Sequence, residues 1–574
     1  MNTHAFISNK VREAMTSINI PEDFDPQVKQ TNRIKFGHYQ VNGIISIAKK
    51  LKKSSFSLAN ELILKIDLQG IAKNITVIKP GFINIYLDEN WLSIQLEKIF
   101  CSSRLSINVV KKPQTIVIDY SSPNLAKEMH VGHLRSTIIG DSSARILEFL
   151  GHKVIRMNHV GDWGNQFGML IAYIIKKKIQ DISLINLEKI YKKSKILYEQ
   201  DINFNSESRN CLKQLQSGNV LHKKIWKKIV KVSLNNNQKI YNRLNVSLKD
   251  QHVLGESFYH NDLSKIVKDL KEKKLAEESE GAIVVFLKEY INKNGQPFGV
   301  IIQKKDGGFL YTTIDIACLK YRYETLKADR ILYYIDARQH LHLMQVFNIA
   351  LKANYITADL QLEHHAFGMI LNDNKQPFKT RSGNTIKLID LLNEGYKKAF
   401  KLIQMKNPCM KDLEKQKLAE IISISAIKYA DLSRNRTHDY IFNWDLMLSF
   451  EGNTAPYIQY AYTRILSILK KSFVKNHEIN NKIIISNTYE MQLAICLLQF
   501  EETIEKTAFL GTPHLICTYL YKISGLFSIF YENCPIINNK KMNIKKSRLK
   551  LAIITAKIIK LGLDLLGIQT IKHM

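Results

Sequence analysis

The chain has 574 residues, of which 45% are hydrophobic and 24% are charged. This composition excludes a fibrous or largely disordered chain, and the length predicts two to four domains. The net charge of +31, from 83 Lys and Arg against 52 Asp and Glu, favours a polyanionic partner such as nucleic acid. Asn and Ile are abundant as well as Lys, so an AT-rich coding sequence explains the excess equally well.

The cysteines and the apolar segments bear on the compartment. Seven cysteines are scattered without metal-ligand spacing, which predicts a reducing, cytoplasmic location and no structural zinc. Residues 1–15 carry charges and lack an apolar core, so we expect no signal peptide. The apolar stretch 549–568 contains three lysines and one aspartate in an amphipathic helical pattern. We therefore expect it to pack on protein and not to span a membrane.

Residues 1–110 have the pattern of a small α/β unit. A helical pattern over 38–53 precedes strand-like runs at 75–78 and 82–87, which flank a Pro-Gly turn. A strand–helix–strand pattern follows, with strands at 115–119 and 153–156 and a helix over 130–150. Such alternation predicts a doubly wound parallel sheet, whose ligands lie beyond the carboxyl ends of its strands.

The rest of the chain completes the predicted organisation. Residues 176–280 are Lys-rich and mainly helical in pattern, strand patterns resume at 283–286 and 300–302, and a strand–helix unit begins at 331. Beyond residue 400 amphipathic helices dominate. We therefore expect an α/β protein in three parts: an N-terminal α/β domain (1–110), a Rossmann-like doubly wound parallel-sheet domain with a helical insertion (111–445), and a C-terminal all-α domain (446–574).

The most informative short motif is His130-Val131-Gly132-His133, which opens a predicted helix directly after a strand and a loop. The two histidines share one face of the first turn, where they can donate to a phosphate that the helix N-terminus already attracts. Gly132 lets a flat base approach the backbone. This arrangement suits ATP whose α-phosphate is attacked, because the donors stabilise the growing charge. The alternative is a helix-capping histidine pair without a ligand.

A longer stretch around this motif carries a family resemblance. Residues 119–137 resemble the signature of arginyl-tRNA synthetases, class I enzymes with the H-I-G-H motif, and the motif stretch consists of Ser122, Pro123, Asn124, Leu125, Ala126, Lys127, Glu128, Met129, His130, Val131, Gly132 and His133. The similarity continues, in order, through residues 159–164, 311–317, 336–340, 367–369, 451–457 and 547–551.

The resemblance implies an activity and its partners. The enzyme would use ATP with Mg²⁺ to convert L-arginine to arginyl-adenylate, releasing pyrophosphate. It would then transfer the arginine to the 3′-terminal adenosine of tRNA(Arg), releasing AMP. The resemblance further implies a cytoplasmic monomer with a tRNA-contacting N-terminal domain and a helical anticodon-binding domain, and no membrane association is expected.

The resemblance also implies an arginine pocket. A guanidinium is best recognised by carboxylates that accept its forked donors. Asp119 and Asp315 would supply them, helped by Tyr311, while the substrate's amino and carboxylate groups would be held by Ser122, Asn124 and Gln339. An uncharged competitor would leave a carboxylate unpaired, so no proofreading domain is needed. The alternative for each aspartate is a structural cap at a strand or helix end.

The second class I signature departs from the family's usual form. K-M-S-K-S normally supplies a lysine that neutralises the triphosphate, but the corresponding stretch 377–383 has Thr380 or Arg381 in that position. Many arginyl enzymes share this loss, and Lys127, beside the histidines, is the supposed substitute. Lys379 and Arg381 are further candidates for binding the phosphates of ATP. The alternative is an ordinary basic surface loop.

The predicted RNA contacts come from the two outer domains. Phe82 and Asn84 lie in a segment that in this family meets the outer corner of the tRNA, although alternating residues on one strand face could equally be packing. Arg464, with Tyr457 and Tyr460, falls on one face of a helix begun by Thr454 and Pro456. Aromatic stripes at helical spacing are more often core, which we favour for the two tyrosines.

Two other functions compete with this interpretation. A nucleotidylyltransferase of the same H-x-G-H superfamily would activate a small acid without RNA, but such enzymes lack a long helical C-terminal domain. A binding protein descended from a synthetase would have lost catalytic residues, whereas both histidines, the predicted arginine-binding residues and the phosphate-loop cations are present.

Overall fold

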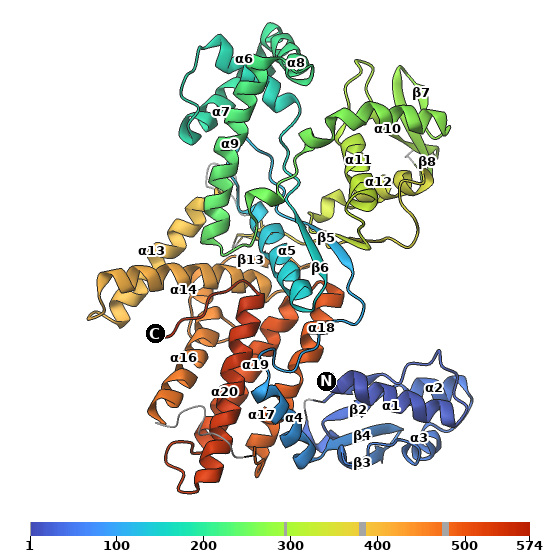
Figure 1. Ribbon diagram of the computed structural model, residues 1–574, viewed down its shortest axis with the longest axis vertical. Coiled ribbons are helices and arrows are strands. Elements are labelled where there is room, and N and C mark those ends of the chain that lie inside the picture. Colours follow the sequence, from blue (N-terminus) through green and yellow to red (C-terminus); the bar gives the residue numbers. More distant parts are fainter. Residues whose placement is uncertain are drawn as a thin grey trace. The chain divides into compact units, whose positions relative to one another are not determined.

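The computed structural model describes residues 2–31, 33–291, 295–372, 374–377, 386–472 and 482–573. The chain divides into two compact units (Figure 1). One unit contains residues 110–448 and 566–568, and the other contains residues 1–109, 449–565 and 569–574. Each unit is built from segments that are distant in the sequence.

The unit around residues 110–448 is built on a four-stranded parallel sheet. Its strands are β5 (Thr115–Asp119), β6 (Lys153–Met157), β10 (Arg330–Tyr333) and β11 (Gln361–His364), in the order β11-β10-β5-β6. The interior strand β5 is buried from Ile116 to Asp119, with Ile116, Val117 and Ile118 each 0% exposed, as its continuous β-branched run requires. The predicted doubly wound parallel sheet is confirmed.

The strand order positions a ligand crevice between β5 and β10. Helix α5 (Gly132–Phe149) follows β5 and leads to β6, whereas α12 (His340–Lys352) follows β10 and leads to β11 on the other side. The strand order therefore reverses between β5 and β10. In open α/β sheets the crevice at this switch point, beyond the carboxyl ends of the strands, is where ligands bind.

Two groups of elements are inserted between β6 and β10. The first is helical: α6 (Asn165–Lys176), α7 (Leu184–Gln200), α8 (Ile202–Gln216) and α9 (Val220–Arg243) share one apolar core (green in Figure 1). The second contains α10 (His260–Glu272), a separate antiparallel sheet of β7 (Glu277–Ser279), β8 (Ala282–Ile291) and β9 (Pro297–Gln303), and α11 (Tyr311–Glu324). The strand patterns at 283–286 and 300–302 thus form a hairpin outside the parallel sheet.

The remainder of this unit is largely helical. It comprises α13 (Leu388–Lys406), α14 (Asp412–Leu432), the short α15 (Trp444–Met447) and a two-stranded parallel pair, β12 (Ile370–Leu371) with β13 (Tyr440–Ile441). Arg135 of α5 pairs with Asp431 of α14 at 3.1 Å, and both side chains are buried. This ion pair fixes the helix that carries the His130–His133 motif against α14.

The other unit begins with an α/β segment. Its sheet has the order β1-β2-β4-β3, from β1 (Val28–Gln30), β2 (Tyr39–Val41), β4 (Phe82–Leu87) and β3 (Ala72–Ile78), and its helices are α1 (Thr3–Ser17), α2 (Ile44–Lys50), α3 (Ser55–Ile63) and α4 (Glu89–Cys101). The predicted helix over 38–53 is wrong at its start. Tyr39 and Val41 are buried on either side of half-buried Gln40, which is the period of a strand.

The C-terminal part of this unit is all-α. It contains α16 (Ala455–Lys471), α17 (Thr488–Leu498), α18 (Phe500–Leu510), α19 (His514–Asn533) and α20 (Met542–Leu565). The predicted helix near the C-terminus packs on protein, since Lys550 of α20 is buried and pairs with Glu97 of α4 at 2.7 Å. Within the described ranges no helix is long and apolar enough to cross a membrane.

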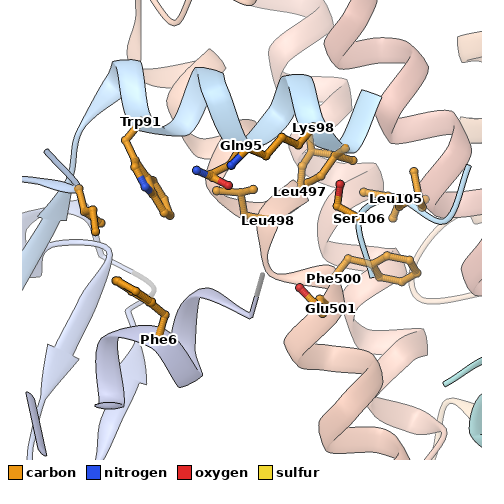
Figure 2. Close-up of a pocket in the computed structure, with 13 residues that line it drawn as sticks. Phe6, Trp91, Gln95, Lys98, Leu105, Ser106, Leu497, Leu498, Phe500 and Glu501 are labelled. Carbon is orange, nitrogen blue, oxygen red and sulfur yellow. The ribbon is translucent and has the colours of Figure 1, made fainter. Parts of the chain in front are cut away.

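A cavity of about 270 Å³ lies in this unit, beside α4 and the corner between α17 and α18 (Figure 2). Its lining is mainly apolar, with Phe6, Trp91, Leu498 and Phe500 among its walls. The charged lining residues are Lys98 and Glu501. Among the described residues, none of those predicted for the site lines this cavity, which leaves the switch-point crevice as the candidate site.

Candidate active site

A cavity of about 680 Å³ opens at the carboxyl ends of β5 and β10. It is lined by most of the residues predicted to bind substrates: Asp119, Ser122, Asn124, His130, Gly132, His133, Tyr311, Asp315 and Gln339. These residues come from segments up to about two hundred positions apart in sequence, and the sheet topology brings them together. The cavity therefore lies where the predicted fold places it.

The loop after β5 is held in an unusual backbone conformation. Ser121, Ser122 and Ala126 have φ values of 70°, 40° and 68°, in the left-handed region that non-glycine residues rarely adopt. Buried side chains stabilise this conformation: the N–H of Ser121 donates to Ser136 Oγ at 2.9 Å, and that of Ser122 donates to Asn158 Oδ1 at 3.1 Å. The surrounding structure thus determines where Ser122 stands in the cavity.

Glycine is required opposite this loop. A Cβ atom on Gly161 would lie 2.0 Å from Oδ1 of Asn124, a distance that no side chain tolerates. The N–H of Leu125 donates to the Gly161 carbonyl at 3.0 Å, so the two backbones run close together. Gly161 therefore leaves the space that the Asn124 side chain occupies.

The two motif histidines form a pair of neutral donors. Their ring centroids are 4.0 Å apart. The N–H of Gly132 donates to His130 Nδ1, and the N–H of His130 donates to His133 Nδ1, both at 3.1 Å, which favours a proton on Nε2 over donation from His133 Nδ1 to the His130 carbonyl at 3.3 Å. Burial, followed by Lys127, lowers the pKa of His130, and burial, followed by His130, lowers the pKa of His133 to about 3. At neutral pH both rings offer an uncharged Nε2–H beside the start of α5.

Helix α11 presents its functional side chains on one face. Tyr311, Asp315, Cys318 and Arg322 recur at helical spacing, and all four line the cavity. Asp315 Oδ2 accepts a hydrogen bond from His342 Nε2 at 2.6 Å, and Oδ1 lies 3.8 Å from His159 Nε2. The Tyr311 ring contacts the His342 ring edge to face, with centroids 4.8 Å apart. The Asp315 carboxylate is thus held by the imidazole of His342 in the cavity wall.

The carboxyl group of Glu256 also lines this cavity, and it was not predicted from the sequence. Glu256 is half-buried at the start of a 3₁₀ turn, Glu256–Tyr259, and its N–H donates to the Val160 carbonyl. Burial, with Asp315 and Asp162 nearby, raises the pKa of Glu256 to about 8. A carboxyl group with this pKa accepts a cationic ligand by releasing its proton. No spacing signal connects Glu256 with Asp315.

Comparison with known proteins gives a single answer. The model for the catalytic domain of class I tRNA synthetases (R) matches residues 95–444, the DALR anticodon binding domain matches 458–574, and the arginyl tRNA synthetase N terminal domain matches 5–87. Arginine–tRNA ligases of Pectobacterium carotovorum and Baumannia cicadellinicola are each 54% identical over 100% of both chains. The chain belongs to the arginyl-tRNA synthetases.

Solved structures agree. Arginyl-tRNA synthetase from Plasmodium falciparum superposes with a TM-score of 0.86 and 32% identity, over 100% of this chain and 99% of that one. The Thermus thermophilus enzyme has the same fold, with a TM-score of 0.82 at 22% identity over 100% of both chains. The synthetase is therefore an arginine–tRNA ligase, and its partners are arginine, ATP and tRNA(Arg). It charges the tRNA through an adenylate, with release of pyrophosphate and AMP.

The residues predicted to replace the K-M-S-K-S lysine have different outcomes. Lys379 and Arg381 lie outside the described residues of the synthetase. Exposed Lys127 does not line the cavity, and its Nζ lies 4.6 Å from the Tyr191 ring centroid. Ile386 lies beside the histidine motif, because its carbonyl accepts from the N–H of Val131 at 3.0 Å. The role of Lys127 in this synthetase remains a prediction.

The predicted tRNA contacts are only partly at the surface. Asn84 is 0% exposed and accepts from Gln40 Nε2 at 2.7 Å, as the packing alternative expects, while Phe82 is half-buried, and its contact with tRNA stays a prediction. Half-buried Arg464 stacks over the Tyr531 ring at 4.9 Å. The expectation that Tyr460 is core is wrong, because it is 49% exposed on α16, one position beyond buried Gln459. Half-buried Tyr457 packs against Tyr521.

Proposed function

We propose that the cavity between β5 and β10 is the site where arginine and ATP react. The observation that carries this proposal is the presence, in one cavity, of the carboxyl groups of Asp315 and Glu256 and a pair of neutral imidazole donors. Asp315 and Glu256 accept the forked donors of the guanidinium, with Tyr311 beside them. Ser122, Asn124 and Gln339 hold the amino and carboxylate groups, and His130 and His133 hold the phosphate next to Gly132.

The geometry supports positioning and charge stabilisation as the catalytic strategy. In the first step, a carboxylate oxygen of arginine forms a bond to the α-phosphorus of ATP, and the bond to pyrophosphate breaks. Negative charge grows on the α-phosphoryl oxygens, where the Nε2–H groups of His130 and His133 and the N-terminus of α5 are complementary to it. In the second step, the terminal adenosine hydroxyl of the tRNA attacks the activated carbonyl, and AMP leaves. Holding the reactants in line supplies the rest of the rate enhancement.

We propose that ATP enters as its magnesium complex. In the described part of the chain no group of three or more His, Cys, Asp or Glu side chains is arranged to hold a metal ion. Mg²⁺ bound mainly by the phosphates and water requires no such group. Lys127, Lys379 and Arg381 remain the candidate cations for the triphosphate.

The domain roles are also part of the proposal. We assign tRNA contacts to residues 1–110, through Phe82, catalysis to 111–445, and anticodon binding to 446–574, through Arg464. The family-model matches at 5–87, 95–444 and 458–574 support these boundaries. The synthetase acts as a cytoplasmic monomer without membrane association.

The site is tested by replacing Asp315 with Asn. Because the carboxylate faces the substrate's guanidinium, this change raises the KM for arginine by about a hundredfold, while the KM for ATP changes less than about threefold. Asp262→Asn, on the exposed face of α10, is the matched control and leaves both values unchanged. Pyrophosphate exchange with a panel of amino acids, with and without tRNA, tests the substrate. An unchanged KM for arginine in Asp315→Asn would remove this cavity from arginine binding.

A further inference from the structure

Asp119 is paired with an arginine of the protein itself. Its Oδ2 accepts from Nη2 of Arg322 at 2.5 Å, and the two residues are 2% and 0% exposed. Asp119 Oδ1 accepts from Ser122 Oγ at 2.7 Å. Both carboxylate oxygens are therefore occupied by neighbouring side chains. A substrate guanidinium at Asp119 would lie against the like charge of Arg322, which is buried in the cavity wall against the ring of Tyr333.

This pairing fixes the direction of the Ser122 hydroxyl. An arginine side chain keeps its charge in proteins, so Arg322 holds Asp119 as an ionised, acceptor-only carboxylate. Ser122 Oγ must then donate its hydrogen inward, to Asp119 at 2.7 Å, and the alternative acceptor, the carbonyl of Tyr120 at 3.4 Å, also lies within the protein. One lone pair of Ser122 Oγ accepts the N–H of His159 at 3.0 Å. The remaining lone pair makes Ser122 an acceptor for a ligand in the cavity.

We propose that Arg322 and Asp119 are positioning residues that set Ser122 Oγ to accept from the α-ammonium group of the substrate arginine. The inference rests on the proposed function of this cavity, and it replaces the expected direct contact between Asp119 and the guanidinium. Asp119 acts through Ser122, and its charge is neutralised internally by Arg322. Asp336 also lines the cavity, but it pairs with Arg338 at 2.8 Å, so the carboxyl groups left for the guanidinium are Asp315 and Glu256.

Asp119→Asn is the informative variant because Arg322 dictates how the amide is oriented. Arg322 is a donor, so the amide oxygen turns toward it and the amide N–H₂ turns toward Ser122. Ser122 Oγ then accepts from the amide as well as from the N–H of His159, so both of its lone pairs are occupied and its hydrogen turns to the carbonyl of Tyr120. The acceptor that faced the α-ammonium group is lost. Removing Arg322 as well, in Arg322→Met/Asp119→Asn, frees the amide to turn and restores the acceptor.

The experiment measures competitive inhibition of tRNA charging by two arginine analogues. δ-Guanidinovalerate lacks the α-amino group, and agmatine lacks the carboxylate but keeps the amino group. In Asp119→Asn we expect the KM for arginine and the Ki for agmatine to rise together by about tenfold or more, while the Ki for δ-guanidinovalerate stays within about twofold. In the double variant the KM for arginine and the Ki for agmatine return most of the way to their natural values. A pair of residues that merely supports the fold would not show this recovery.

Two further variants separate the possible failures. Ser122→Ala removes the acceptor without leaving a buried charge, so it gives the same selective loss even if Asp119→Asn does not fold. Asp315→Asn weakens all three ligands equally, since each carries a guanidinium. If Asp315→Asn affects none of them, the proposed function of the cavity fails. If Asp315→Asn weakens all three, and Asp119→Asn and Ser122→Ala also weaken all three equally, the positioning role of Asp119 and Arg322 is overturned.

Discussion

The Nε2 atom of His342 donates to Oδ2 of Asp315 across 2.6 Å, which joins helix α12 to helix α11 at the wall of the cavity. The same imidazole contacts the ring of Tyr311, so its position is fixed from two directions. Asp315 Oδ2 is thereby held in place, while Oδ1 lies 3.8 Å from His159, beyond hydrogen-bond distance. The hydrogen bond from His342 orients the Asp315 carboxylate through Oδ2 and leaves Oδ1 available to a ligand.

Replacing His342 tests this orientation. In His342→Ala the ionised Asp315 carboxylate loses the hydrogen bond that it accepts from the imidazole. A hydrogen bond that involves a charged group is worth about 1.5–3 kcal/mol, so the KM for arginine is expected to rise by about tenfold or more. The KM for ATP should remain within about twofold, because the phosphate-binding histidines are untouched. Steady-state charging assays measure both values. His342→Gln retains a donor and should recover part of the loss; a Gln variant no better than Ala would contradict an orienting role.

The raised pKa of Glu256 predicts a pH dependence of arginine binding. With a pKa of about 8, Glu256 is protonated in the free enzyme at neutral pH, and a bound guanidinium favours the ionised form. Binding therefore releases a proton, so the affinity for arginine rises as the pH approaches 8 and levels off above it. The KM for arginine should fall by up to about tenfold per pH unit below this point.

The control for this profile is Glu256→Gln, which cannot release a proton at this position. Its KM for arginine should be higher than that of the natural enzyme above pH 8 and should depend little on pH. The measurement is the arginine KM, at saturating ATP and tRNA, over the neutral to mildly alkaline range. A Gln variant with the same pH profile as the natural enzyme would assign the titration to another group.

The sequence was sufficient for the catalytic core because its signals are local. A buried β-branched strand and a helix-opening motif lie within forty residues, and β5, α5 and β6 follow them closely. Strand order then follows from the general behaviour of doubly wound sheets. The sequence therefore placed the motif histidines at the carboxyl end of β5, whereas Asp315 and Tyr311 were assigned to the same site only through the family resemblance.

Other features depend on partners that only the folded chain brings together. Glu256 precedes Asp315 by 59 positions and acquires its raised pKa from burial and two distant carboxylates. The ion pair of Asp119 with Arg322 spans 203 positions. From the sequence alone, an aspartate that binds the substrate therefore cannot be distinguished from one that positions a neighbouring side chain. Asn84 and Tyr460 show the same limit, because periodicity gives the face of an element but not what covers that face.

The close approach of Gly161 to Asn124 predicts a loss of activity without loss of the fold. In Gly161→Ala the new Cβ would lie 2.0 Å from Asn124 Oδ1, so the Asn124 side chain must leave its position in the cavity. We expect kcat/KM for arginine to fall by about tenfold to a hundredfold, because misplacing a substrate-holding group by about 1 Å carries a cost of that size.

The matched control is Gly525→Ala, since a Cβ at that position of α19 meets nothing within 4 Å. This variant should retain activity and gain slight stability from its better helix propensity. Thermal unfolding of both variants distinguishes a local displacement from general destabilisation. If Gly161→Ala charges tRNA normally, the observed position of Asn124 is not required for catalysis.

The neutral state of His133 leads to a final prediction that separates catalysis from RNA binding. Burial and His130 lower the pKa of His133 to about 3, so its ring stays uncharged, with a proton on Nε2, throughout the neutral range. His133→Ala removes one donor to the developing phosphoryl charge and should reduce arginine-dependent pyrophosphate exchange, measured with tRNA present, by about a hundredfold to a thousandfold. Affinity for tRNA(Arg), measured by filter binding, should change less than about threefold, because the side chain lies in the small-molecule cavity.

The control is His222, which likewise lies in the first turn of a helix, α9. Its ring contacts Asn219 and does not line the cavity, so His222→Ala should preserve both activities. Equal losses of exchange and tRNA affinity in His133→Ala, accompanied by a lower unfolding temperature, would instead give this histidine a structural role.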